Sequence, residues 1–165
     1  MDAPGPTDEK SRDRLSEITL DTKSLASANA NIEHEREVAI FDIIDGNVFA
    51  VEGLDLGPYT LHLAIAGDRL QLTIGSADTP GIAQHSVPLM PLKRIMKDYF
   101  MVCESYYEAV RAAPPARIQA IDVNRRSLHD EGSTALREKL LGKIVVDSDT
   151  ARRLFTLLCA LHWKG

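Results

Sequence analysis

The segment YTLHLAIAGDRLQLTIGS, residues 59–76, constrains the fold of this chain more than any other stretch of its sequence. Large apolar residues alternate with smaller or polar ones on both sides of Gly67, which is the pattern of two strands that each bury one face. A glycine-containing turn between two such runs is typical of an antiparallel hairpin. A third strand is expected at 82–90, and Pro88 favours an edge position because proline cannot donate a ladder hydrogen bond. The middle of the chain therefore predicts an antiparallel meander.

Most of the remaining sequence has its apolar residues at helical spacing. The clearest helix begins at Pro91, where proline is tolerated in the first turn, and its apolar stripe runs from Leu92 to Val110. Gly132 is expected to end the helix that follows, because glycine commonly terminates helices. Helices are expected at 31–45, 91–112, 117–132, 133–141 and 149–163.

The first and last of these helices predict specific buried faces. In the first, Asn31 is a suitable N-cap, and Val38, Phe41 and Ile44 recur at helical spacing. The last is apolar nearly all round between 154 and 161, so it is expected to be the most buried helix.

Two short strands, at 15–21 and 143–147, complete the expected elements. A run of strands followed by a run of helices favours an α+β fold: a small, mainly antiparallel sheet of these strands and the meander, with about five helices packed against it. The length of 165 residues suits one domain. Residues 1–14, rich in proline, glycine and charge, are predicted to be a disordered tail, which leaves 15–165 as a single domain.

Composition excludes several classes of protein. The net charge of −5 does not suit a dedicated nucleic-acid binder, which must neutralise phosphates. The first residues lack the apolar stretch of a secretory signal, and the most apolar run, LFTLLCALHW, is too short to span a bilayer. We therefore expect a cytoplasmic protein in which Cys103 and Cys159, both in apolar helical patterns, are buried free thiols.

Three segments carry a family resemblance: EHEREVAIFDIID, KRIMKDYFMVCESYYEAVR and DTARRLFTLLCALHWKG. Together they resemble an uncharacterised family of short bacterial proteins, best known from alphaproteobacteria and named with a UPF label. The resemblance extends over roughly residues 15–165 and includes RRSLHDEGS. It implies a cytosolic bacterial protein and assigns no catalytic residue.

A cluster of charge around Arg125, Arg126 and His129 is the first candidate site. On a helix, Asp122 reaches both arginines and Arg126 reaches Asp130. Arg125 borders a narrow apolar stripe, where a partly buried guanidinium favours a planar anionic partner. His129 is expected near a helix C-terminus, where the dipole favours its protonated form. The cluster is either an anion pocket or an internal ion network that anchors Arg125 to an acid on a neighbouring helix.

A second basic cluster, Lys93, Arg94 and Lys97, lies in the first turns after Pro91. Cations there oppose the helix dipole, so either an anionic ligand or an acidic segment of the same protein, such as 33–37, would explain them.

The same helix carries aromatic and apolar residues away from its main stripe, which suggests a protein or dimer interface. These interface candidates are Phe100, Met101 and Tyr107.

No catalytic signature, cofactor motif or paired metal-ligand motif is present in the sequence. Cys159 and His162 have ligand spacing but lack a second close pair, so we expect neither metal nor cofactor. The first interpretation is a non-catalytic binding or regulatory protein that acts through a helical partner surface or as a homodimer. The alternative is an enzyme or sensor for a small phosphorylated or carboxylated metabolite, bound by the cluster around Arg125.

Overall fold

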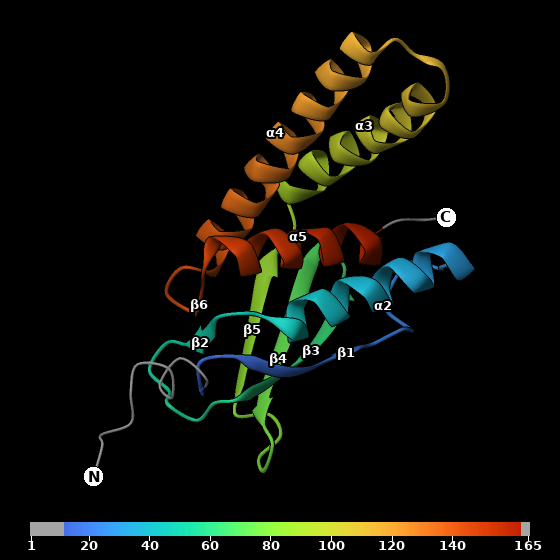
Figure 1. The fold of residues 1–165 in the computed structure, drawn as a ribbon. Helices are drawn as coiled ribbons and strands as arrows, with labels where there is room; N and C mark the ends of the chain where they lie inside the picture. The colour runs from blue at the N-terminus through green and yellow to red at the C-terminus, as the bar shows by residue number, and fades with distance from the viewer. Residues whose placement is uncertain (1–11, 163–165) are drawn as a thin grey trace.

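The computed structural model describes residues 12–162 and has the α+β architecture that the sequence predicts (Figure 1). The main sheet has four strands in the order β1-β3-β4-β5. β3, β4 and β5 are antiparallel neighbours, which confirms the meander, and β1 pairs with β3 in parallel. Pro88 ends the edge strand β5, as predicted. The strands are β1 Leu15–Leu20, β3 Tyr59–Ala66, β4 Arg69–Ser76 and β5 Ala83–Pro88.

A second, two-stranded sheet joins β2 (Phe49–Val51) to β6 (Ile144–Val146) in antiparallel register. The prediction that the late strand joins the main sheet is therefore wrong. The sequence also does not reveal β2, because three residues are too few to show an alternating pattern. Both strands bury their ends in the core, where Phe49 is 0% exposed.

Four helices lie within residues 12–162, where the sequence predicts about five. The difference arises at Gly132, which does not end a helix but lies inside α4. None of these four is long and apolar enough to cross a membrane. They are α2 Ala30–Asp45, α3 Leu92–Ala112, α4 Pro115–Leu140 and α5 Ser148–His162.

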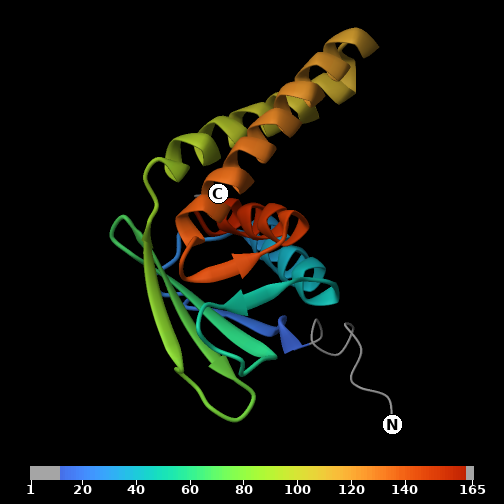
Figure 2. The same ribbon diagram turned by 90° about the vertical axis from the view of Figure 1, so that its left-hand side faces the viewer.

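α3 and α4 form a helical hairpin, here called the arm, that projects away from the rest of the molecule (Figure 2). α2 and α5 lie together on one face of the main sheet (Figure 1). The base of α4 packs on α5 where Gly132 meets the ring of Phe155: a Cβ at Gly132 would stand 2.2 Å from the ring atom Cζ. This close approach leaves no room for a side chain, which explains why a glycine stands inside the helix.

α5 is the most buried helix, as predicted, and Phe155 and Leu157 within it are 0% exposed. The buried face of α2 differs from the prediction. Its buried residues are Ile32, Arg36, Ala39 and Ile43, whereas Val38 and Phe41 are 43% and 68% exposed.

The N-cap of α2 is Asn29, whose side chain accepts a hydrogen bond from the backbone N–H of Ile32, and not Asn31. The helix therefore begins earlier than the apolar spacing suggests.

The predicted tail extends too far into the chain. The carbonyl oxygens of Asp13 and Arg14 accept hydrogen bonds from the backbone N–H groups of Phe49 and Tyr59. Asp13 and Arg14 thus belong to the folded part, because Asp13 bonds to the first residue of β2 and Arg14 continues the pairing of β1 with β3. Residues 1–11 lie outside the described part of the chain.

Candidate functional site

Asp122, Arg125 and Arg126 form an ion network on α4 against α3. One carboxylate oxygen of Asp122 accepts hydrogen bonds from Nε and Nη2 of Arg125, at 3.1 and 2.5 Å, and the other lies 3.2 Å from Nε of Arg126. The guanidinium carbon of Arg125 stands 4.9 Å from the ring centroid of Tyr106 on α3, within the range of a cation–π contact. The acid that holds Arg125 thus lies on the same helix, and the neighbouring helix contributes an aromatic ring.

The ion pair between Arg125 and Asp122 is partly withdrawn from solvent. The side chains of Arg125 and Asp122 are 31% and 25% exposed. The hydrogen bonds to Asp122 raise the pKa of Arg125, although its partial burial acts in the opposite direction. An incoming anion would have to compete with Asp122 for a guanidinium that is already paired.

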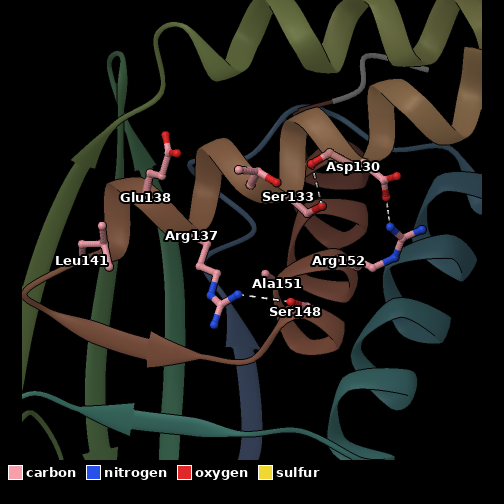
Figure 3. Close-up of a pocket in the computed structure, with 9 residues that line it drawn as sticks. Asp130, Ser133, Arg137, Glu138, Leu141, Ser148, Ala151 and Arg152 are labelled. Atoms are coloured by element: carbon pink, nitrogen blue, oxygen red, sulfur yellow. Dashed lines mark hydrogen bonds and ion pairs between the residues drawn. The ribbon is translucent and has the colours of Figure 1, made fainter.

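The predicted pair between Arg126 and Asp130 is absent from the described residues, because Asp130 pairs with Arg152 of α5 instead. This ion pair borders a hollow of about 420 Å³ between α4 and α5 (Figure 3). Arg137 lines the same hollow and donates a hydrogen bond to Oγ of Ser148 at 3.1 Å. Since both arginines are engaged within the protein, the hollow offers little to an anionic ligand.

His129 is buried at the junction of α3, α4 and α5. Its ring makes edge contacts with Tyr99 and Phe155, each at 5.3 Å between centroids. Its Nε2 lies 2.7 Å from Oγ1 of Thr156, whose hydroxyl proton is donated to the carbonyl oxygen of Arg152 at 3.1 Å. A threonine hydroxyl has one proton, so Nε2 of His129 is the donor. Within residues 12–162, Nδ1 is buried and accepts no hydrogen bond.

These surroundings favour the neutral form of His129. Burial lowers its pKa to about 4, and the nearby charges of Arg152 and Arg125 act in the same direction. The sequence suggested a protonated histidine near a helix end. That suggestion is wrong because α4 continues for more than two further turns.

The free energy of unfolding is expected to fall with acidification through His129. Its folded pKa lies below the ordinary value near 6.5, so between pH 6.5 and about 4 the unfolded chain binds the extra proton. The wild type should lose about 2 kcal/mol relative to His129→Gln between pH 7 and pH 4.5, because glutamine does not titrate. Denaturant unfolding of both proteins across this range measures the difference. Parallel stability curves would contradict it.

In the second basic cluster, one residue pairs with an acid of the same protein and the other two are exposed. Nζ of Lys93 lies 2.6 Å from a carboxylate oxygen of Asp68 in the turn between β3 and β4, and this contact lowers the pKa of Asp68. The acidic partner is therefore this turn and not the segment 33–37. Arg94 and Lys97 are exposed.

A cleft of about 560 Å³ opens between α2, α3 and α5, and we call it the inter-helix cleft. Its charged lining is acidic: the described lining residues include Glu35, Asp42 and Glu104 but no lysine or arginine. Val38 of α2 and Tyr107 of α3 line it as well, and both are large apolar side chains exposed to solvent.

Two of the interface candidates line this cleft. Phe100 is half-buried and Tyr107 is 66% exposed, and both contribute to the lining. Met101 is 58% exposed and lines an adjoining hollow of about 440 Å³ on α3.

Both thiols and the phenol of Tyr99 line the inter-helix cleft. All three groups are poor nucleophiles. Cys103 and Cys159 are free, as predicted, although Cys103 is only half-buried. Burial raises the pKa of both thiols and of Tyr99. A thiol that stays protonated reacts slowly, so the cleft lacks an activated sulfur. In the described part of the chain, no group of three or more His, Cys, Asp or Glu side chains could hold a metal ion.

Sequence reasoning missed Arg36, the most buried charged side chain among residues 12–162. Its Nε donates to the carbonyl oxygen of Ala160 at 3.0 Å, and its Nη2 donates to that of Ala26 at 2.9 Å. Arg36 therefore binds the C-terminal end of α5, where backbone carbonyl groups lack partners within the helix. The sequence offered one signal for this role: Arg36 is a single arginine among the acidic and polar residues in the first half of α2.

The family model described as "Uncharacterised protein family (UPF0262)" matches residues 12–164. The chain belongs to this family. The resemblance inferred from the three sequence segments is thereby confirmed, and the UPF0262 family has no assigned function.

Relatives within UPF0262 are similar over nearly their whole length. A UPF0262 protein of Nitrobacter winogradskyi is 51% identical over 160 residues, which cover 97% of this chain and 96% of the relative. A UPF0262 protein of Rhodopseudomonas palustris strain TIE-1 is 50% identical over 165 residues, the full length of both. No solved structure matches the chain.

Proposed function

We propose that this chain is a cytoplasmic, non-catalytic binding protein that holds a cationic, amphipathic helical segment of a partner protein in the inter-helix cleft. The charge of the cleft carries the proposal. Glu35, Asp42 and Glu104 are all exposed, and the described lining contains no lysine or arginine to neutralise them. Complementary charge directs a partner to such a surface and selects against anionic ones.

The apolar part of the lining suits the apolar face of a helix. Val38 and Tyr107 expose 43% and 66% of their surface on opposite walls of the cleft. Large exposed apolar side chains that gather in a groove are typical of interaction sites, and an amphipathic helix binds by laying its apolar face into such a groove. The lining residues therefore provide both the contact area and the acidic edges.

The chemistry around the cleft supports binding rather than catalysis. Cys103 and Cys159 are protonated thiols, since burial raises the pKa of each. His129 directs Nε2 to Thr156, a lining residue, and burial keeps its imidazole neutral. Free thiols also suit a reducing cytoplasm.

The alternative function, a site for a small anionic metabolite, has weaker support. Arg125 and Arg126 both pair with Asp122, and His129 is buried and neutral. To bind here, an anion would need to break this network, and His129 would need to take up a proton in a desolvated position.

Two model peptides test the proposed function. Both are amphipathic helices of about 14 residues with the same leucine face; one has lysine and the other glutamate on its polar face. We expect fluorescence anisotropy to show saturable binding of the lysine peptide only, weakened by salt because the attraction is partly electrostatic. Equal affinity for the two peptides, or no binding of either, would overturn the proposal.

Matched variants on α2 place the peptide in the cleft. Glu35→Lys reverses a lining charge and should weaken binding of the lysine peptide about tenfold. Glu37→Lys makes the same change on the same helix outside the cleft, so its affinity should stay near that of the wild type. Val38→Ser should weaken binding without changing the salt dependence. An equal loss in the two charge variants would show that binding follows net charge alone.

A further inference from the structure

α3 carries an exposed strip on which the sign of the charge changes at Met101. Arg94 and Lys97 precede Met101, and Glu104 and Glu108 follow it. All five residues are exposed. They are spaced by three, four, three and four residues along the helix, which places them on one face.

The helix itself does not explain this order of charges. Cations stabilise the C-terminal end of a helix and anions the N-terminal end, but Arg94 and Lys97 lie in the first turns of α3 and Glu108 in its last turns. No ion pair within residues 12–162 involves any of the four charged residues. Lys93, one residue before the strip, shows the contrast, because it pairs with Asp68. The strip is therefore arranged for something other than its own helix.

We propose that a second copy of this chain packs antiparallel on this strip, about a twofold axis near Met101. An isologous contact requires a surface that is complementary to itself, and a strip that is cationic on one side of its centre and anionic on the other meets this requirement when reversed. A parallel arrangement would place like charges opposite one another. This interface goes beyond the proposed function, since its occupant is a second copy of this chain on the exposed face of α3 rather than a partner segment in the cleft; the two surfaces share Glu104.

The positions along the helix match in an antiparallel pair. Arg94 and Glu108 each lie seven residues from Met101, about 10 Å along the axis at the helical rise of roughly 1.5 Å per residue. Arg94 of one copy is therefore level with Glu108 of the other. Lys97 lies four residues before Met101 and Glu104 three residues after it, so this second pair is offset by only about 1.5 Å. Met101 of each copy lies at the centre, where its apolar side chain, 58% exposed in the single chain, would be covered.

Asp98 is the one acid in the cationic half of α3, and its position agrees with the pairing. It lies on the edge of the strip that also carries Ser105. A twofold axis perpendicular to both helices brings equivalent edges together, so Asp98 of one copy faces Ser105 of the other. A carboxylate can accept a hydrogen bond from that hydroxyl. The pairing therefore leaves no like charges opposed among these residues.

The arm presents the strip to a second molecule. α3 projects from the body together with α4 (Figure 2). A hollow of about 440 Å³ on this face is lined by Lys97, Met101 and Glu104, among others, and it could receive the methionine of the second copy.

Charge reversal in each half of the strip provides a decisive test by sedimentation equilibrium. The double variant Arg94→Glu/Lys97→Glu makes the whole strip anionic, and Glu104→Lys/Glu108→Lys makes it cationic. We expect the wild type to form dimers and each reversed variant to dissociate with a Kd raised at least about a hundredfold, because like charges then face each other. A wild type that remains monomeric at about 100 µM, a concentration far above typical dissociation constants of specific interfaces, would overturn the proposal.

Recombination of the variants separates loss of the interface from loss of folding. An equimolar mixture of the two reversed variants should form a heterodimer, and the fourfold variant that exchanges both halves should again form a homodimer. Failure of both combinations, with circular dichroism spectra unchanged, would also overturn the proposal.

As a second measurement, Met101→Cys should yield a disulfide-linked dimer on mild oxidation with oxidised glutathione, which is reduced to glutathione in the exchange. The wild type, which keeps half-buried Cys103, is the control. Glu104 belongs to both the strip and the cleft, so the two proposals are separated by variants that avoid it. Glu35→Lys and Val38→Ser leave the strip unchanged, and Arg94→Glu/Lys97→Glu leaves the described lining of the cleft unchanged.

Discussion

Gly132→Ala is expected to lower the free energy of unfolding by about 3 kcal/mol, although alanine normally favours a helix over glycine by about 1 kcal/mol. The new Cβ would stand 2.2 to 2.7 Å from three ring atoms of Phe155. Phe155 is 0% exposed, and its ring also contacts His129 and Tyr99. The ring cannot move without displacing these neighbours, so the strain is not relieved locally. Denaturant unfolding of the two proteins measures the effect.

A smaller side chain at position 155 provides the control for this prediction. Phe155→Leu removes the ring atoms that a Cβ at Gly132 would meet and has its own cost from a cavity. The double variant should therefore be less destabilised than the sum of the two single variants by at least about 1 kcal/mol. If the two effects simply add, the clash with Phe155 is not the reason for glycine at this position.

Arg36→Met is expected to lower the free energy of unfolding by about 3 kcal/mol. Methionine retains much of the apolar length of arginine but leaves the carbonyl oxygens of Ala160 and Ala26 without their donors, and buried unpaired polar groups are costly. The N–H groups of Arg36 also lie against the negative end of the α5 dipole. The bond to Ala160 and the dipole contribution depend on the contact between α2 and α5, and the bond to Ala26 holds the segment before α2.

Two further arginine variants test that explanation by thermal or denaturant unfolding. Arg36→Lys keeps the charge but cannot direct two donors in the fixed geometry of a guanidinium. Its free energy of unfolding is therefore expected to lie between those of the wild type and Arg36→Met. Arg117→Met makes the same replacement at an exposed position of α4 and should change stability by no more than about 0.5 kcal/mol. A small effect of Arg36→Met, equal to that of Arg117→Met, would contradict the assigned role.

The candidate sites show how far local patterns extend. Spacing on a helix correctly placed Asp122 within reach of Arg125 and Arg126, because positions three and four apart are neighbours on any helix. It did not place Asp130, whose partner Arg152 is on α5. The protonation of His129 was likewise beyond local reasoning, since the pKa follows from burial between α3 and α5.

The inter-helix cleft could not be found from the sequence, even though its residues were visible there. Val38 was assigned to the buried face of its helix, and Tyr107 was recognised only as an aromatic outside the main stripe. Which of two possible faces of α2 is buried depends on Arg36, whose amphipathic side chain lies inside because the end of α5 needs donors. Once Arg36 and Ala39 face inward, Val38 lies on the wall of the cleft.

The sequence by itself determined the elements whose signals repeat over many residues: the hairpin 59–76, the long helix from Pro91 and the apolar helix α5. Repetition makes such signals robust, since each further residue supports the same period. The tertiary structure alone decided the continuity of α4 through Gly132, the pairing of β6 with the three-residue β2, and the burial of Arg36 and His129. Each of these involves a few contacts between distant parts of the chain, such as the hydrogen bond from Arg36 to a carbonyl group 124 residues away. A single residue has no period, so only the folded chain reveals what it meets.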